Sequence, residues 1–132
     1  MERRHILVVE DDRPTLMLLE KTLVSAGYRT TGVLDGIAAL KAARADPPDL
    51  VLLDLIIPGV DGYGVCALLK RDTTFHAPIV VLSGRTNEKD IKAALGAGAD
   101  AFLPKPIDRK NLLAKVADLL AAGPTPEMKE SL

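Results

Sequence analysis

The sequence predicts an α/β fold in which helices cover both faces of a parallel β-sheet. Five short apolar runs alternate with five longer segments whose apolar residues recur at helical spacing, a pattern of repeated strand–helix units. Three of the runs lack the polar alternation of a strand with one solvated face, so we expect them to be buried on both faces. The 132 residues suit one compact domain.

The predicted strands are short, and their composition indicates their place in the sheet. They comprise residues 5–9, 29–33, 50–53, 78–82 and 101–103. The first, third and fourth are apolar on both faces and belong in the middle, whereas the second and fifth are weaker or shorter and belong at the edges. The order 2-1-3-4-5 places them so, in a flavodoxin-like (βα)5 three-layer sandwich, although other orders remain possible on the pattern alone.

The predicted helices follow the strands, and start or stop signals bound them. Pro14 opens the first helix, where its missing N–H costs nothing, and Gly27 closes it. Pro47 stops the second, Asp108 caps the fifth, and the fourth covers about residues 87–95. The apolar positions that mark the other helices are Leu16, Leu19 and Leu23 in the first, Ile37, Leu40 and Ala43 in the second, Val65, Leu68 and Leu69 in the third, and Leu112, Val116, Leu119 and Leu120 in the fifth.

The composition argues against several classes of protein. A net charge of −1, from 17 basic and 18 acidic residues, does not favour nucleic acid or a membrane surface as the partner of this segment. No apolar run approaches the roughly 20 residues of a membrane-spanning helix, and we do not expect a signal peptide at the start. Cys66 is the only cysteine, which rules out an internal disulfide and fits a reducing, cytoplasmic location. We expect residues 1–121 to form the domain and residues 122–132 to be a flexible tail or the start of a linker.

Polar residues follow four of the five predicted strands. They are Glu10, Asp11 and Asp12 after the first strand, Asp54 after the third, Ser83 after the fourth and Lys105 after the fifth. In open parallel sheets, ligands bind at the carboxyl ends of the strands, near the point where the strand order reverses. We therefore expect these side chains to meet at one edge of the sheet.

The carboxylates of this edge predict a metal site and phosphoryl chemistry. Several carboxylates in one place repel each other unless a cation lies among them or some are protonated. Oxygen ligands without histidine or cysteine favour Mg²⁺, with Mn²⁺ as a substitute, and Mg²⁺ is often held by one or two carboxylates together with a phosphate. A carboxylate such as Asp54 can attack phosphorus, and the metal, Lys105 and Ser83 could neutralise the transferring group.

Each of these residues has a more ordinary explanation when it is taken alone. An acidic run is most often a helix N-terminus, and a strand-end aspartate is often a helix cap. A single serine is usually a turn hydroxyl, and a single lysine is usually a surface charge. Their joint placement after four strands is what favours a functional site.

Four runs of the sequence together resemble the receiver domain of two-component response regulators. They are residues 6–12 (ILVVEDD), 50–62 (LVLLDLIIPGVDG), 80–84 (VVLSG) and 102–106 (FLPKP). The resemblance covers about residues 4 to 121, and the four motifs are specific in combination and in this order.

The resemblance implies a role for each residue of the acidic edge. Asp54 matches the phosphoryl acceptor, which is also a ligand of Mg²⁺. Glu10 and Asp11 match the acidic pair at the metal, Asp11 as a direct ligand and Glu10 mainly through water. The backbone carbonyl of Ile56 matches a further ligand, and Asp12 falls one position past the acidic pair.

The resemblance also implies roles for residues around the phosphoryl group. Ser83 matches the hydroxyl that binds this group and shifts toward it, and Lys105 matches the lysine that pairs with its oxygens. Phe102 matches the aromatic switch residue that turns inward when Ser83 moves, and the bond before Pro106 is expected to be cis. A further expectation does not come from the resemblance. Ile56 lies two residues after Asp54 and Arg85 two residues after Ser83, so both are expected to screen the phosphorylated aspartate from water and to slow its hydrolysis.

The function implied is that of a signalling switch. The domain would accept a phosphoryl group from a sensor histidine kinase or a histidine phosphotransfer protein, and would catalyse only its own phosphorylation and dephosphorylation. The added charge would switch the face formed by the fourth helix, the fifth strand and the fifth helix. That face would act on a downstream effector or on a C-terminal output domain.

Three alternatives share features of the sequence. A flavodoxin-type electron carrier shares the fold, but its flavin phosphate needs donors after the first strand, where this chain is acidic. A phosphatase of the haloacid dehalogenase type has a second aspartate two residues after the nucleophile, where this chain has Ile56. A degenerate receiver would bind partners without phosphorylation, and the intact set of Asp54, the acidic pair, Ser83 and Lys105 argues against it.

Overall fold

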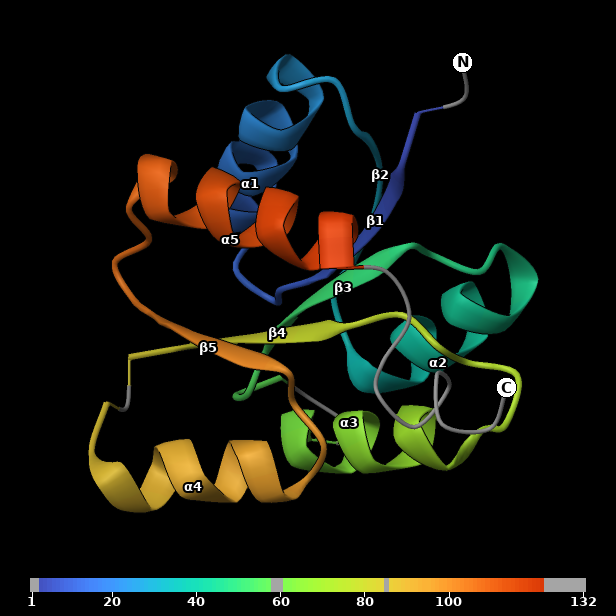
Figure 1. Ribbon diagram of the computed structural model, residues 1–132, viewed down its shortest axis with the longest axis vertical. Helices are drawn as coiled ribbons and strands as arrows, with labels where there is room; N and C mark the ends of the chain where they lie inside the picture. The colour runs from blue at the N-terminus through green and yellow to red at the C-terminus, as the bar shows by residue number, and fades with distance from the viewer. Residues whose placement is uncertain (1–2, 58–60, 85, 123–132) are drawn as a thin grey trace.

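The computed structural model describes residues 3–57, 61–84 and 86–122, and strands and helices alternate along them (Figure 1). The strands are β1 (His5–Val9), β2 (Arg29–Val33), β3 (Leu50–Asp54), β4 (Ile79–Ser83) and β5 (Ala101–Pro104). The helices are α1 (Arg13–Ser25), α2 (Gly36–Ala45), α3 (Gly62–Arg71), α4 (Glu88–Gly96) and α5 (Arg109–Ala122). None of these helices is both long enough and apolar enough to cross a membrane.

The five strands form one parallel sheet in the order β2-β1-β3-β4-β5. The predicted flavodoxin-like order is therefore confirmed, with the weaker strands β2 and β5 at the edges. In the register of the sheet, Asp54 of β3 lies opposite Leu82 of β4, and Ser83 lies opposite Pro104 of β5. The carboxyl ends of the central strands consequently lie close together.

Two apolar cores, one on each face of the sheet, hold the layers together. Alternate residues of each central strand point to opposite faces, so Val8 belongs to one core and Val9 to the other. The core containing Val8 is closed by α1 and α5, and the core containing Val9 is closed by α2, α3 and α4, as Figure 1 shows. The central strands are buried on both faces, as their sequences predict.

Two of the apolar residues that mark helices in the sequence do not enter these cores. Ile37 of α2 is 53% exposed, and Leu68 of α3 is 45% exposed. The smaller Ala39 and Cys66 are buried instead. Apolar residues at helical spacing identify a helix correctly. When two neighbouring stripes of the same helix both contain apolar residues, however, the spacing does not show which stripe faces the sheet.

The helix boundaries follow local hydrogen bonds. Asp12, at the start of α1, accepts the N–H of Thr15 at 3.0 Å, and Asp108, at the start of α5, accepts the N–H of Asn111 at 3.1 Å. Gly98 follows α4 with a φ of 112°, a conformation that favours glycine. The capping role predicted for Asp108 is confirmed, and α4 begins and ends one residue later than the predicted range of about 87–95.

Candidate functional site

The polar residues at the carboxyl ends of the strands meet at one edge of the sheet. Glu10 directly follows β1, Asp54 ends β3, Ser83 ends β4, and Lys105 directly follows β5. The backbone N–H of Lys105 donates to the carbonyl of Ser83 at 2.9 Å, which ties the end of β5 to the end of β4. Residues almost a hundred positions apart in the sequence thus become neighbours because the strands are parallel.

Three carboxylates of this edge form a cluster that fits a divalent cation. Glu10, Asp11 and Asp54 each offer an oxygen, and these oxygens all lie within 4.8 Å of one another. Glu10 is 1% exposed and Asp54 is 6% exposed, whereas Asp11 faces solvent. A donor set made only of oxygen with this much negative charge is suited to a small hard ion such as Mg²⁺. We refer to these three residues as the acidic cluster.

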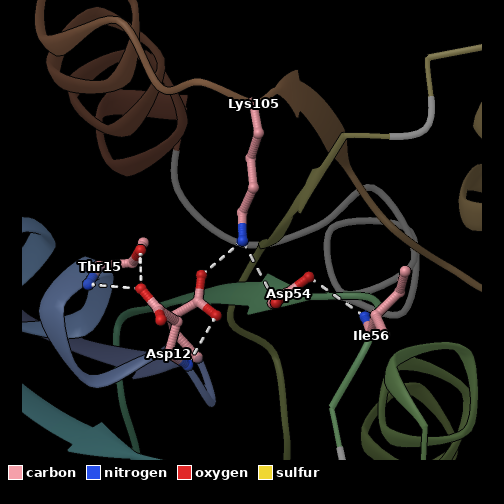
Figure 2. A network of polar contacts seen from close by, with 6 residues as sticks. Asp12, Thr15, Asp54, Ile56 and Lys105 are labelled. Carbon is pink, nitrogen blue, oxygen red and sulfur yellow. Dashed lines mark hydrogen bonds and ion pairs between the residues drawn. The ribbon is translucent and has the colours of Figure 1, made fainter.

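Lys105 reaches into the acidic cluster from β5. Its Nζ lies 2.5 Å from Oε1 of Glu10 and 3.3 Å from Oδ2 of Asp54, and Figure 2 shows its side chain directed toward Asp54. One ammonium group therefore neutralises part of the charge of two buried carboxylates. Because it touches both, any change of charge on Asp54 acts directly on this ammonium group.

The pKa values of this pair reflect burial and mutual contact. Burial raises the pKa of the Glu10 carboxyl above its usual value, and the hydrogen bond from Lys105 offsets this only in part. Burial alone would lower the pKa of the Lys105 ammonium, but the carboxylates of Glu10 and Asp54 outweigh it and raise this pKa. Lys105 therefore stays positively charged beside these carboxylates at neutral pH.

Backbone groups fix the orientation of the carboxylates. The N–H of Ile56 donates to Oδ1 of Asp54 at 3.1 Å, a contact drawn in Figure 2. The N–H of Asp12 donates to Oε2 of Glu10 at 3.2 Å. The side chain of Asp12 itself turns to Thr15, whose N–H and hydroxyl both donate to it. Asp12 is thus the cap of α1 and lies outside the acidic cluster.

One contributor to this geometry carries no functional group and received no role from the sequence. Gly62, the first residue of α3, packs so closely on the end of β3 that a Cβ atom there would lie 2.4 Å from the Cα of Leu55. Its backbone N–H also donates to the carbonyl of Leu55 at 3.0 Å. The sequence signals that could have pointed to it are the pair Asp61-Gly62 at a helix start and the place of Gly62 at the end of the run 50–62.

The remaining predicted site residues lie around the acidic cluster. Ser83 is buried at the end of β4. Phe102 is partly buried on β5, opposite Val81, and packs against the core that α2, α3 and α4 close. The peptide bond between Lys105 and Pro106 is cis. The side chain of Ile56 is 56% exposed, and Arg85, its predicted partner in screening, lies outside the described residues.

Comparison with known proteins identifies the family. Residues 6–117 match the response regulator receiver domain. The chain belongs to this family. It is 36% identical over 128 residues to the transcriptional regulatory protein CseB of Streptomyces avermitilis, covering 93% of this chain and 54% of CseB. It is 43% identical over 115 residues to the response regulator PleD of Caulobacter vibrioides, covering 86% of this chain and 25% of PleD.

A solved receiver domain has the same fold. The receiver domain of the sensor histidine kinase PA1611 from Pseudomonas aeruginosa PAO1 superposes with a TM-score of 0.84 at 30% sequence identity. The superposition covers 91% of this chain and 99% of that one, which was solved with a magnesium ion coordinated in its active site cleft. The family match places the chain in two-component signalling and removes the flavodoxin and phosphatase alternatives.

The chain is shorter than the curated relatives it matches. It spans about half the length of CseB and a quarter of the length of PleD. The similarity therefore covers only part of each of these regulators.

Proposed function

We propose that Asp54 accepts a phosphoryl group from a phosphohistidine of a partner protein in a reaction that requires Mg²⁺. The observation that carries this proposal is the acidic cluster with Lys105 between two of its members. A structural ion pair needs one carboxylate, whereas a divalent metal and a phosphoryl group together call for several carboxylates and a cation. The partner is a sensor histidine kinase or a histidine phosphotransfer protein.

The acidic cluster would hold the metal with the backbone carbonyl of Ile56, and Mn²⁺ could replace Mg²⁺. The exposure of Asp11 supports direct coordination, because an ion arriving from solvent can reach its carboxylate. Glu10 is buried and already accepts from Lys105 and from the N–H of Asp12, which favours contact with the metal through water. When bound, the metal supplies positive charge that neutralises phosphoryl oxygens.

The transfer step exchanges one bond to phosphorus for another. Oδ1 of Asp54 is held by the N–H of Ile56, and Oδ2 faces the ammonium of Lys105. We assign the attack to Oδ2, which forms a P–O bond while the P–N bond to the donor imidazole breaks and its electron pair returns to the ring nitrogen. Lys105 would then pair with the phosphoryl oxygens, and Ser83 would donate its hydroxyl to them.

Phosphorylation replaces a carboxylate by a group with more negative charge, and the neighbouring residues should respond. Lys105 would shift from Glu10 toward the phosphoryl group, and Ser83 would move with it because its carbonyl is bonded to the backbone of Lys105. Phe102 lies on β5, two residues before Pro104, the residue opposite Ser83 in the sheet. Its ring would turn inward into the space that Ser83 leaves. The fraction of molecules in each of two conformations of the face formed by α4, β5 and α5 would thereby change.

The same residues would limit the lifetime of the signal. Hydrolysis requires water to attack the phosphorus of the acyl phosphate, which releases inorganic phosphate and restores the Asp54 carboxylate. Catalysis by the domain is confined to this reaction and to its own phosphorylation. We propose Ile56, whose side chain is exposed beside Asp54, and Arg85 as the residues that restrict access of water.

The output would pass through a downstream effector or through a C-terminal output domain. The greater length of CseB and PleD supports the second route. We place the exchange in the cytoplasm, where the ATP that supplies a histidine kinase is found, and we assign no nucleic acid or membrane contact to this segment itself.

Acetyl phosphate, a small phosphoryl donor, tests the proposal without knowledge of the partner. Incubation with Mg²⁺ should increase the intact mass of the protein by one phosphoryl group, and chelation of the metal should prevent it. The Asp54→Ala variant should show no adduct, while its circular dichroism spectrum reports that it is folded. An adduct of equal yield in folded Asp54→Ala would contradict the assignment of Asp54.

A further inference from the structure

A groove of about 580 Å³ lies at the edge of the sheet opposite the acidic cluster. It is bordered by the C-terminal ends of α2, α3 and α5 and by the loops that lead into β3 and β4. Apolar side chains line much of it, among them Leu69 of α3, Phe75 of the following loop, and Leu119 and Leu120 of α5. Its size is within the range of sites that bind a ligand or a peptide side chain.

Two arginines and two aspartates lie on the rim of this groove. Asp49 accepts the backbone N–H of His5 at 2.7 Å, and Asp72 accepts both the N–H and the hydroxyl of Thr74. Arg4 and Arg44 also line the groove, and neither forms an ion pair with another residue of the described ranges. Arg44 interacts electrostatically with the Asp72 carboxylate, whose pKa it helps to lower. Arg4 and Arg44 therefore offer two positive charges to an occupant, next to two aspartates and above an apolar floor.

We propose that residues 123–132 of this chain occupy the groove. This segment lies outside the described residues, and it begins directly after Ala122, two positions past Leu120 in the wall of the groove. Ten residues in extended form span roughly 33 Å, which is ample to cross a site of this size. The occupant is thus already tethered at one end of its binding site, and tethering gives it a high effective concentration.

The composition of the segment complements the groove. It contains two large apolar side chains, Met128 and Leu132, and two carboxylates, Glu127 and Glu130. Met128 and Leu132 suit the apolar floor near Leu69. The glutamates suit the two arginines of the rim. Pro124 and Pro126 disfavour continuation of the helix, so an extended path away from α5 is expected.

If residues 123–132 occupy the groove, they connect the two helical layers of the molecule; we refer to this segment as the strap. It would join the end of α5 on one face of the sheet to the ends of α2 and α3 on the other face. The strap lies at the opposite edge from Asp54 and does not depend on phosphorylation. It would also fix the direction in which the chain leaves the receiver domain.

Matched substitutions in the full chain test this inference by amide chemical shifts. Met128→Asp with Leu132→Asp should move the resonances of Leu69, Phe75 and Arg44. Thr125→Asp with Ser131→Asp adds the same charge, retains both apolar side chains, and should leave those resonances in place. The reverse experiment, Arg44→Glu, should move the amides of residues 127–130.

Two results would overturn the proposal. Coincident groove resonances in the wild type and both double variants would mean that the segment does not bind there. Differences between the groove resonances of the wild type and of Met128→Asp/Leu132→Asp that disappear on dilution would mean that the groove binds a second copy of the chain. Acetyl phosphate labelling of Asp54 should be equal in all of these variants, which separates this test from that of the proposed function.

Discussion

Lys105 shows how a single residue can connect two buried charges. Its ammonium lies between Glu10 and Asp54, and in the absence of metal it is the cation closest to both among the described residues. Removing one member of a buried ion pair leaves the charge of the other member uncompensated and poorly solvated. The contribution of Lys105 should therefore depend on whether Glu10 is ionised.

The Lys105→Met variant should be less stable than the wild type without Mg²⁺, by about 1–3 kcal/mol near neutral pH. Burial already raises the pKa of Glu10, and loss of Lys105 should raise it further. A carboxyl whose folded pKa is raised contributes stability below its unfolded value of 4.5 and loses it as pH rises. The loss of unfolding free energy in Lys105→Met relative to the wild type should thus be small near pH 4.5 and should grow toward neutral pH. Urea unfolding at several pH values measures this difference.

The control for this variant is Lys92→Met. Lys92 pairs with Glu88 on the exposed surface of α4, where an ion pair contributes less than about 1 kcal/mol. Its effect should be small and nearly independent of pH in this range. A deficit in Lys105→Met that is equal at both ends of the pH range would contradict the role given to Glu10.

Cys66 provides a second prediction at the scale of a residue. Burial raises the pKa of its thiol to about 11, against an ordinary value of 9.0. Two pKa units mean roughly a hundredfold smaller thiolate fraction at mildly alkaline pH, so reaction with a disulfide reagent should be slower by at least about that factor. A cysteine introduced at the exposed position Asp118 should react rapidly in the same protein. Equal rates for the two thiols would contradict the burial of Cys66.

At the scale of elements, the packing of α3 on the end of β3 helps to position Asp54 and the backbone of Ile56. The start of α3 packs on the backbone of Leu55, where only a glycine fits. The sequence places the strand and the helix correctly but does not reveal this contact, since it depends on how the two approach in space.

The Gly62→Ala variant should be destabilised by about 1–3 kcal/mol, because its Cβ would meet backbone atoms that cannot move aside cheaply. Phosphorylation of Asp54 should also slow down. Gly96→Ala is the matched control, because among the described residues no atom beyond its chain neighbours and the backbone of its own helix lies within 4 Å of the added Cβ, and alanine is the better helix former. The control should be as stable as the wild type or slightly more so. Similar thermal stability of both variants would contradict the close packing of Gly62.

Element by element, the sequence predicts more of the fold than of the contacts. Apolar runs without alternation identify β1, β3 and β4 as central, because only a strand covered on both faces tolerates them. In the sequence, Ile37 and Leu68 mark the apolar faces of α2 and α3, yet both are exposed. This difference arises because each helix has apolar residues on adjacent stripes. The choice between stripes depends on the curvature and packing of the sheet, which no local pattern contains.

At the scale of the whole molecule, the edge that carries the acidic cluster was predictable once the strand order was known. Parallel strands bring their carboxyl ends together, so Glu10, Asp54, Ser83 and Lys105 could be grouped from sequence alone. Their mutual contacts could not be predicted in this way. The burial of Glu10 and its short contact with Lys105 depend on the depth of each side chain, which follows only from the assembled layers.

Binding of Mg²⁺ should stabilise the folded chain as a whole, since an unfolded chain cannot assemble the acidic cluster. At a hundredfold excess over the dissociation constant the gain is about 2.7 kcal/mol, which thermal unfolding would detect as a higher midpoint. Asp11→Asn should abolish most of this gain, whereas Asp118→Asn, an exposed carboxylate on α5, should preserve it. An equal response to Mg²⁺ in Asp11→Asn would argue against metal binding in the acidic cluster.

The most direct test of the central claim is to locate the phosphoryl group in the unmodified chain. Borohydride reduces an acyl phosphate to the alcohol, so the phosphorylated aspartate becomes homoserine and can be found by peptide mass spectrometry. After treatment with acetyl phosphate and Mg²⁺, we expect homoserine at position 54, in the peptide that contains β3. Homoserine at Asp11, or a label that resists borohydride, would contradict the assignment of Asp54 as the acceptor.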